Sequence, residues 1–483
     1  MLRPHQEKAT EMLRQSMRQG NKNCILAAPC SFGKTRVAVE ILKAVAENGK
    51  LGIFICDRIK LVDQALAEFD RAGVRVGVLQ ADHWRSDPNA PIQIASIQTI
   101  ARRRYKPLFH LAIIDECHTH YKATTELMES SRNSLFVGLS ATPYSKGLGN
   151  FYSDLIVPIT TQELLDQGYL CPVKYYGGIH ANLNGVKTKR ISTGAVDYDP
   201  KSLSDAVEKD PSLVGAIIEN FKRFGKGQTI AFSPSIKHSQ KLVEMFRDEG
   251  FSAEHIDGYM DPEERQELFE GHDNGDFQIL SCSRLLNTGY DAPQVQTLID
   301  CFSTKSKITF VQRAGRIMRK HASKEEAIYL DHSGNVQWHG WPESIVPESL
   351  HCGEKDYSEK RLTKEKVEGE LSVCPQCYQH YMVRCVCGYQ RPSKKVLESD
   401  GQILKELKKT NREVSTEDKS RWLGDFQLYA KTKGYKQGWS AWAYKGKFGV
   451  WPNKIEAAQS REISADVKSH IIHMQIRRAK SAK

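Results

Sequence analysis

Short apolar runs recur through roughly the first 335 residues, and polar segments with helical spacing separate many of them. The runs read CILAA, LGIFIC, IQIAS, LAIID and LFVGLS, followed by TIAFS, FQILSC, TLIDC and AIYLD. Most are rich in Ile, Val and Leu without alternation, which is typical of parallel strands buried on both faces. The pattern therefore predicts an α/β chain with two consecutive parallel-sheet domains.

The character of the chain changes along its length, and the changes predict four regions. We expect a first α/β domain over residues 1–165 and a second over 166–345, with the joint within 151–172. Residues 180–200 carry turn formers without a core pattern, so we expect an irregular insertion there. A charged linker and a cysteine cluster occupy 346–395, and a basic, mostly helical region follows over 396–483.

Composition narrows the class of protein. Hydrophobic residues make up 40% of the chain, which excludes a fully disordered protein. No apolar run approaches the ~18 residues of a membrane span, and the chain starts with the polar LRPHQEKATEMLRQSM, so we expect an intracellular, cytoplasmic protein with no membrane partner. The net charge of +11 favours a polyanion as partner.

Residues 23–42, NCILAAPCSFGKTRVAVEIL, place Gly33, Lys34 and Thr35 between a strand-like run and a segment with helical spacing. In such a loop, backbone N–H groups and the helix N-terminus cradle phosphates. Lys34 would reach the β- and γ-phosphates, and the Thr35 hydroxyl would hold Mg²⁺. The alternative is a chance Gly-Lys-Thr after a strand.

An acidic pair follows 81 residues after Lys34. Asp115 and Glu116 come directly after the apolar run LAII. A carboxylate at a strand tip suits Mg²⁺ coordination, and its neighbour suits orienting or deprotonating an attacking water. An acidic pair that merely opens a loop is common, but this pair follows a candidate phosphate loop at a spacing of several strands.

From these residues onward the chain resembles the superfamily 2 helicases. The matching motifs are LRPHQ (2–6), APCSFGKT (28–35), DECH (115–118), SATP (140–143), NTGYDAP (287–293) and QRAGRIMR (312–319), in the family's order. The resemblance covers about residues 1–340 and implies two RecA-like domains with ATP and Mg²⁺ between them. Ser31 and Phe32 depart from the usual loop.

The resemblance also implies roles for individual residues. Arg3 and Gln6 would read the adenine; the loop residues Ala28, Pro29, Cys30, Ser31, Phe32, Gly33, Lys34 and Thr35 would hold the phosphates; and Asp115 would bind Mg²⁺ with Thr35. Catalysis would rest on Lys34, Asp115, Glu116, Gln312, Arg316 and Arg319. Gly289 would bind the nucleotide, and Asp291 would touch the ribose or couple the cleft to the nucleic acid. Ser140 and Thr142 would link Glu116 to the nucleic-acid face. His118 either does the same or makes a local hydrogen bond.

Nucleic-acid contacts follow from the same resemblance. Arg58, Ser96 and Gln98 in the first domain, with Ser233 and Lys237 in the second, match motifs that hold a phosphate backbone; for Arg58 and Lys237 the alternative is a solvated charge. Within the superfamily, the chain looks closest to the duplex-DNA branch, which includes the bacterial RadD repair helicases, phage helicases and the type III restriction motor. The branch is consistent with a phage or prophage origin and with work in the nucleoid or in a phage-infected cell.

Twelve cysteines divide into two groups. Scattered ones such as Cys24, Cys56, Cys282 and Cys301 are expected to be small buried hydrophobes. In contrast, Cys374, Cys377, Cys385 and Cys387 fall within fourteen residues, and four thiolates so close suit one structural Zn²⁺. Because the second pair is Cys-x-Cys, His380, Cys352 or His351 is an alternative ligand.

Residues 421–451 hold nine aromatic residues, with six Lys or Arg and one acid. Aromatic and basic side chains interleaved in this way suit single-stranded nucleic acid, and we single out Trp439 and Trp442 as stacking candidates. The alternative is a small helical domain whose aromatic residues form its core.

We therefore expect an ATP-dependent DNA motor that acts on single-stranded, forked or branched DNA in replication, recombination or repair, with a single-strand-binding protein as a candidate partner. One alternative is an RNA helicase. A second is a non-hydrolysing adaptor that binds DNA or a single-strand-binding protein through its zinc module and C-terminal tail. Intact catalytic residues argue against the adaptor.

Overall fold

The computed structural model describes residues 2–352 apart from 58–59, 81–82, 104–105, 179–182, 184, 192–195, 209–211, 284–289 and 291, and then 372–373, 380–381, 387, 404–407, 416–435, 438–448, 451–452, 455–460, 463–464, 467 and 470–471. The chain divides into two compact units. The first contains both large sheets and the second contains the helices α14 and α15, and each is described by itself.

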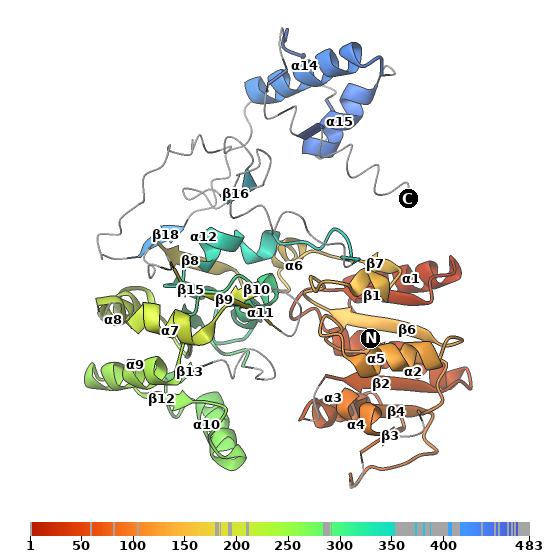
Figure 1. Ribbon diagram of the computed structural model, residues 1–483, viewed down its shortest axis with the longest axis vertical. Coiled ribbons are helices and arrows are strands. Elements are labelled where there is room, and N and C mark those ends of the chain that lie inside the picture. The colour runs from red at the N-terminus through yellow and green to blue at the C-terminus, as the bar shows by residue number, and fades with distance from the viewer. Residues whose placement is uncertain are drawn as a thin grey trace. The chain divides into compact units, whose positions relative to one another are not determined.

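Seven described strands form the first sheet, in the order β3-β4-β2-β5-β6-β1-β7, and all their pairings are parallel (Figure 1). The strands are β1 (Asn23–Ala27), β2 (Gly52–Cys56), β3 (Val76–Val78), β4 (Ile92–Ser96), β5 (Leu111–Ile114), β6 (Leu135–Ser140) and β7 (Asp154–Ile156). The helices of this domain are α1 (Pro4–Arg18), α2 (Lys34–Glu47), α3 (Lys60–Arg71), α4 (Ile97–Arg102), α5 (Lys122–Ser130) and α6 (Thr161–Asp166), with a short 3₁₀ turn η1 (Leu148–Asn150).

Both faces of the first sheet are buried, which explains the unbroken apolar runs. Along β2, Phe54 and Cys56 belong to one apolar cluster, while Ile53 and Ile55 belong to another. Successive side chains of a strand point to opposite faces, so the two clusters lie on the two sides of the sheet. A strand with a core on each side needs an apolar residue at every position.

The second sheet has the order β12-β13-β11-β14-β15-β8-β18. Its strands are β8 (Val173–Gly177), β11 (Thr229–Phe232), β12 (Ala253–Ile256), β13 (Ile279–Cys282), β14 (Thr297–Asp300), β15 (Ala327–Asp331) and β18 (Lys405–Leu407). Its helices are α7 (Pro200–Glu208), α8 (Ser212–Phe224), α9 (Ile236–Asp248), α10 (Pro262–Asn274), α11 (Lys307–Ile317) and α12 (Asn335–His339), followed by the 3₁₀ turn η3 (Pro342–Ser344). The prediction of two parallel-sheet α/β domains is confirmed, and all nine apolar runs are strands in them.

The expectation of an irregular insertion over 180–200 was wrong for part of that segment. The strands β9 (Thr188–Arg190) and β10 (Val196–Tyr198) pair in an antiparallel manner and form a hairpin. Every residue of β9 is exposed, so the strand has no apolar pattern for sequence analysis to detect. The hairpin is instead held by Asp197, whose carboxylate accepts hydrogen bonds from the Thr304 hydroxyl at 2.6 Å and from the Lys305 N–H at 2.7 Å.

The described start of the segment that was expected to be a linker, up to residue 352, is docked on the first domain, and residues 404–407 of the next region are docked on the second. Near its start, the carbonyl oxygen of His351 accepts a hydrogen bond from the N–H of Gly149 at 2.9 Å, and Leu350 packs on the core of the first domain. Farther on, Leu404 is buried in the core of the second domain, and its N–H donates to the Asn220 side-chain oxygen at 2.8 Å. The beginning of the region expected over 396–483 therefore belongs to the second sheet, through β18.

In the second unit, α14 (Thr416–Thr432) and α15 (Trp439–Phe448) pack on each other around Trp422, Phe426 and Tyr444. Short strands β16 (Ser372–Val373) and β17 (His380–Tyr381) pair in an antiparallel manner. Among the helices of the described ranges, none is both long and apolar enough to cross a bilayer.

Candidate active site

The loop between β1 and α2 folds into a compact turn. Gly33 caps the N-terminus of α2 with a φ of 85°, and Ser31 has a φ of 65°. Left-handed residues of this kind turn successive backbone N–H groups toward one concavity, which suits an anion. The Lys34 ammonium donates to the carbonyl oxygens of Ala28 and Pro29, both at 3.4 Å. Lys34 is thus folded over the turn, within reach of any phosphate held there.

Phe32, one of the two unusual loop residues, anchors the turn to the core. Its side chain is fully buried in the apolar cluster behind the first sheet, and its N–H donates to the Pro29 carbonyl oxygen at 3.2 Å. An apolar anchor here fixes the loop through burial, where the usual motif depends on glycine flexibility.

Gln6 on α1 braces the same loop. Its side-chain N–H donates to the Phe32 carbonyl oxygen at 2.9 Å, and its side-chain oxygen accepts from the Arg3 N–H at 2.9 Å. Gly33 has a φ of 85°, which favours glycine, and a Cβ added there would lie 2.5 Å from the Gln6 amide nitrogen and displace the Gln6 side chain. An amide has two donors and two acceptor lone pairs, so Gln6 keeps one of each to read a base.

Sequence analysis missed two residues of this corner, His5 and Tyr169. The His5 ring is buried between Phe32 and Tyr169, with centroid distances of 5.1 and 4.6 Å, and burial followed by the charge of Arg3 lowers its pKa. The Arg3 guanidinium lies 5.2 Å from the Tyr169 ring centroid. Tyr169 lies within DQGYL, after α6, and no motif in that stretch points to α1.

Asp115 and Glu116 follow β5 at the edge where the loop lies. Glu116 has a φ of 47°, which is rare for a residue with a side chain and marks a constrained turn. Burial and the neighbouring charge of Glu116 raise the pKa of Asp115 to about 7, while the charge of Lys34 opposes the shift. A cation beside Asp115 would favour the ionised carboxylate, so Asp115 and the Thr35 hydroxyl fit the hard oxygen donors that Mg²⁺ prefers.

The pKa of Glu116 moves in the opposite direction. Burial raises it, but the hydrogen bond and charge of His118 and the charges of Lys34 and Arg316 outweigh burial, so the net pKa is below its usual range. Two adjacent carboxyl groups with opposite pKa shifts are typical of a site where one acid binds a cation and the other handles a proton.

His118 connects Glu116 to two other motifs. Its Nδ1 lies 3.1 Å from a Glu116 carboxylate oxygen and 3.0 Å from the Ser140 hydroxyl, and its Nε2 lies 3.4 Å from the Gln312 side-chain nitrogen. The Ser140 hydroxyl also accepts from the Thr142 N–H at 3.0 Å. His118 therefore combines a local contact with Glu116 and two contacts that are long-range in sequence, with Ser140 and Gln312.

Helix α11 brings the second domain against the phosphate loop. A Cβ added to Gly315 would lie 2.6 Å from the Cys30 Cβ, so this glycine permits the close approach. Burial lowers the pKa of Arg316 and the charge of Glu116 raises it, and the guanidinium also donates to the Tyr290 carbonyl oxygen. Burial likewise lowers the pKa of Arg319. Gly289 and Asp291, which were expected to bind the nucleotide, lie outside the described residues.

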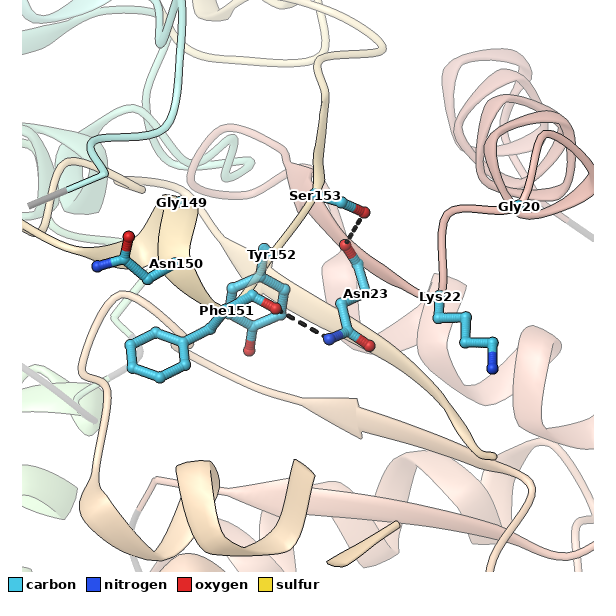
Figure 2. A pocket seen from close by; sticks show the side chains of 8 residues that line it. All are labelled: Gly20, Lys22, Asn23, Gly149, Asn150, Phe151, Tyr152 and Ser153. Carbon is cyan, nitrogen blue, oxygen red and sulfur yellow. Dashed lines mark hydrogen bonds between the residues drawn. The ribbon is translucent and has the colours of Figure 1, made fainter. Parts of the chain in front are cut away.

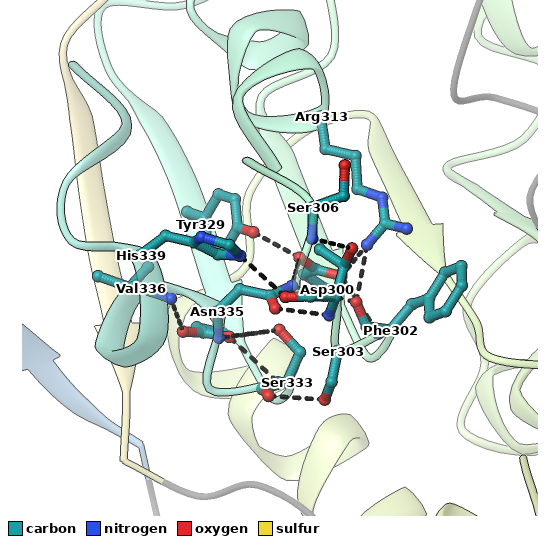
Figure 3. A network of polar contacts seen from close by, with 12 residues as sticks. Asp300, Phe302, Ser303, Ser306, Arg313, Tyr329, Ser333, Asn335, Val336 and His339 are labelled. Atoms are coloured by element: carbon teal, nitrogen blue, oxygen red, sulfur yellow. Dashed lines mark hydrogen bonds and ion pairs between the residues drawn. The ribbon is translucent and has the colours of Figure 1, made fainter. Parts of the chain in front are cut away.

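Arg313, on the same helix, was not singled out from the sequence. Its side chain is fully buried and donates to the Asp300 carboxylate at 3.1 Å and to the Phe302 carbonyl oxygen at 2.8 Å (Figure 3). The other Asp300 oxygen accepts from the Tyr329 hydroxyl at 2.5 Å and from the Asn335 amide at 2.8 Å. This network ties α11 to the end of β14, to β15 and to α12, and so holds the helix that carries Arg316.

The residues that were predicted to contact nucleic acid differ in their exposure to solvent. Ser96 caps α4 and is buried, and Gln98 donates to the Asp57 carbonyl oxygen at 2.8 Å. Ser233 is fully buried, and its hydroxyl lies 3.2 Å from His238 Nδ1, so the side chain is engaged inside the domain. Lys237 is exposed at the start of α9. Arg58 lies outside the described residues.

The two tryptophans of the C-terminal region that were singled out as stacking candidates differ in burial. Trp439 is partly buried against the core of the second unit, with its ring centroid 4.9 Å from that of Tyr435. The Trp442 side chain is 44% exposed. Trp422, Phe426 and Tyr444 form a core, as the alternative interpretation expected, and nucleic-acid binding by the partly exposed Trp442 stays a prediction.

Of the cysteine cluster, Cys387 alone is described, and Cys374, Cys377 and Cys385 lie outside the described residues. The described part of the chain contains no group of three or more potential metal ligands. Among the alternative ligands, the Cys352 thiol packs against η1, where it would lie 2.6 Å from a Cβ added to Gly149.

A separate shallow pocket lies at the amino end of β1, opposite the phosphate loop (Figure 2). Asn23 closes it by donating to the Phe151 carbonyl oxygen at 2.9 Å, and its backbone oxygen accepts from the Ser153 hydroxyl at 3.1 Å. The pocket is lined by Gly20, Lys22, Asn23 and residues 149–153, and none of these belongs to the site.

Two protein families match the chain. The family described as the type III restriction enzyme, res subunit, matches residues 1–145, and the helicase conserved C-terminal domain matches residues 212–321. A 51.5 kDa protein of a Lactococcus phage is 27% identical over 367 residues, which are 73% of this chain and 74% of that protein. The ATP-dependent DNA helicase uvsW of phage T4 is 21% identical, over 64% of this chain and 65% of its own.

A yeast protein and a solved structure extend the comparison. A candidate ATP-dependent helicase of Saccharomyces cerevisiae, IRC3, is 24% identical, and the match spans 69% of this chain but about half, 52%, of that protein. The structure of a candidate HsdR subunit of a type I restriction enzyme from Vibrio vulnificus has a TM-score of 0.55 at 20% identity, and covers 71% of this chain and 67% of its own. At this identity the structural likeness concerns the fold.

Proposed function

The chain belongs to the superfamily 2 ATP-dependent helicases, in the branch that is similar to type III restriction enzymes, and from this we propose that it couples ATP hydrolysis to movement along DNA. The observation that carries the proposal is the contact chain through His118. It joins Glu116, where water would be activated, to Ser140 in one direction and to Gln312 of the second domain in the other. A change at the phosphates can therefore be passed to both domains.

The roles we propose follow from position and charge. Lys34, Arg316 and Arg319 offer positive charge to the phosphates, where negative charge develops during transfer. Glu116, whose pKa is lowered, is ionised and can accept a proton from the attacking water. Thr35 and Asp115 would hold Mg²⁺, which when bound neutralises phosphate charge. Gln6 would read the adenine with its remaining donor and acceptor.

We infer that the substrate is DNA, with single-stranded, forked or branched forms as the preferred substrates in replication, recombination or repair. The net charge of +11 and the DNA helicase relative support a nucleic-acid partner. The phage relative supports action in a bacterial cytoplasm, on the nucleoid or on phage DNA, where a single-strand-binding protein would be a natural partner.

The decisive measurement is ATP hydrolysis by the full chain with single-stranded, duplex, forked and four-way DNA, each beside an RNA of the same length. We expect stimulation by DNA above the RNA control. Stimulation by RNA alone would identify an RNA helicase. A chain that binds DNA with no hydrolysis under any condition would be a non-motor adaptor.

We also propose that Cys374, Cys377, Cys385 and Cys387 hold one structural Zn²⁺. Their number and spacing support it, because four thiolates form a tetrahedral site and a segment this short cannot build an apolar core. Purified protein should contain one zinc per chain, and replacing Cys374 and Cys377 with serine should remove it and loosen DNA binding while basal ATP hydrolysis persists.

Cys352→Ser is the matched control for this prediction, since Cys352 is exposed and packs against Gly149. It should leave the zinc content unchanged. Loss of zinc from the Cys352→Ser variant would show that Cys352 is one of the zinc ligands. Absence of zinc from the purified wild-type protein would exclude the zinc site.

We propose that the C-terminal region strengthens DNA binding without taking part in catalysis. Residues 408–483 contain 17 Lys or Arg and 7 Asp or Glu, so they carry +10 of the net +11. Truncation should follow Leu407, because an earlier cut would remove β18 and the buried Leu404 from the second domain. We expect this truncation to weaken DNA binding and flatten its salt dependence while basal ATP hydrolysis persists.

A pair of tryptophans separates binding from folding in the same region. Trp442→Ala should weaken DNA binding by roughly 1–3 kcal/mol with unchanged stability, because Trp442 is exposed. Trp422→Ala should instead destabilise the second unit by about 3–5 kcal/mol, because Trp422 is buried. If truncation leaves DNA affinity and its salt slope unchanged, the region binds something other than DNA.

A further inference from the structure

The β9–β10 hairpin is fixed to the second domain in a way that leaves its basic side chains outside. Asp197 is buried and is fully engaged by Thr304 and the Lys305 N–H. The two ends of the hairpin are closed by the Asp199 N–H, which donates to the Lys187 carbonyl oxygen at 2.7 Å. The described strands of the hairpin are therefore paired with each other and anchored to the second domain through Asp197, while the residues of β9 stay exposed.

Basic side chains outnumber acidic side chains on and around this hairpin. The described residues of the hairpin, of the start of α7 and of the loop before α11 include six basic side chains, all at least partly exposed: Lys187, Lys189, Arg190, Lys201, Lys305 and Lys307. Three acids share the area. Asp197 is buried, Asp199 pairs with Lys189 at 3.6 Å, and Asp205 remains exposed. A surface with this balance attracts a polyanion.

An exposed aromatic ring lies beside one of these cations, Lys305. The Trp338 side chain on α12 is 58% exposed. The Lys305 ammonium lies 5.8 Å from the Trp338 ring centroid and 4.8 Å from that of Tyr198, on β10. A tryptophan face beside a lysine is the combination with which proteins stack an unpaired base and hold the adjoining phosphate.

The surface lies at the carboxyl ends of the strands of the second sheet. The second-domain residues that were expected to hold a phosphate backbone follow the same strand ends. Strands β11 and β14 are parallel neighbours, with Phe232 opposite Asp300, so Ser233 and Cys301 leave the sheet at the same edge. The loop that binds Asp197 follows Cys301 directly. A strand of nucleic acid crossing the start of α9 can therefore continue toward Trp338.

We propose that Trp338, Lys305 and the basic strand β9 form a further binding surface for a single DNA strand. Trp338 stacks a base, Lys305 neutralises an adjacent phosphate, and Lys187 and Arg190 hold the backbone farther along. The proposal rests on the proposed function, since it assigns part of the path of the DNA that the motor moves on.

The test uses the full chain, a labelled oligothymidylate, and a probe of the same length and charge whose bases are absent. Trp338→Ala should weaken binding to the oligothymidylate by roughly five- to 150-fold and leave binding to the abasic probe unchanged. Trp338→Phe should restore most of the loss because it keeps an aromatic face. Basal ATP hydrolysis without DNA should match wild type in each variant.

Charge is tested separately. Lys187→Glu and Arg190→Glu should weaken binding to both probes and reduce the slope of log affinity against log salt by roughly 0.7 for each lost contact. Lys50→Glu is the matched control, because Lys50 is exposed in the turn between α2 and β2 of the first domain and the substitution makes the same change in charge. The Lys50→Glu variant should bind both probes with the same affinity as wild type.

Two failures can be told apart. If wild type binds the oligothymidylate and both Trp338→Ala and Arg190→Glu bind equally well, the hairpin surface is overturned and the proposed function stands; a protein partner would give this result. If wild type binds no DNA and its ATP hydrolysis is not stimulated by DNA, the proposed function itself fails, and the surface with it.

Discussion

Glu116→Gln is expected to bind ATP and hydrolyse it roughly 10²–10⁴-fold more slowly than wild type, because it loses the group that accepts a proton from water. The amide has nearly the same shape as the carboxylate and can still contact His118, which lies 3.1 Å from Glu116. Binding and turnover should therefore separate. Nucleotide affinity by fluorescence titration and the hydrolysis rate in single turnover measure the two effects.

Lys34→Ala is the companion variant and should lose both properties. Lys34 donates to two loop carbonyl oxygens and its charge acts on both Asp115 and Glu116, so its removal takes away the cation for the phosphates. Full hydrolysis by Glu116→Gln, or unchanged nucleotide affinity in Lys34→Ala, would contradict these assignments.

Arg316→Ala and Arg313→Ala should fail in different ways although they lie one turn apart on α11. Arg316 is placed to act on charge in the cleft, so its removal should slow hydrolysis by about 10³–10⁵-fold with little change in stability. Arg313 is fully buried and paired with Asp300, so its removal leaves an uncompensated buried carboxylate and should cost about 3–5 kcal/mol of stability.

Thermal unfolding and single-turnover hydrolysis, measured on both variants, distinguish the two roles. Arg313→Met is a further check, because it keeps apolar volume while removing the charge. A stable but inactive Arg313→Ala would mean that Arg313, and not Arg316, faces the phosphates.

The amino-acid sequence alone was sufficient for the two α/β domains. Strands such as β2 and β5 are buried on both faces, so every residue in them is apolar and the run is visible without any tertiary information. The edge strands β3, β7 and β12 were not predicted from the sequence, because they lack such a run of buried apolar residues. β12 has two half-buried residues among four, and β3 and β7 have three residues each, so neither a long run nor alternation marks them.

The sequence also placed the chemical groups of the phosphate loop and the acidic pair, because their function depends on residue type and local order. A strand, a turn with Gly33 and a helix that begins at Lys34 are all local features. The spacing to Asp115 follows from the number of intervening strands.

Only the tertiary structure decided which of these groups act on one another. His118 contacts Gln312 across 194 positions, Arg313 pairs with Asp300 in the interior, and Gly315 makes room for Cys30. The motif QRAGRIMR singled out Arg316 and Arg319, but it did not reveal the buried pairing of Arg313. The hairpin at 188–198 and the strand at 405–407 exist because distant partners, Thr304 and Asn220, satisfy Asp197 and the Leu404 N–H. Residue type fixes what a side chain can do, whereas burial and long-range partners, which short sequence patterns do not contain, decide what it does.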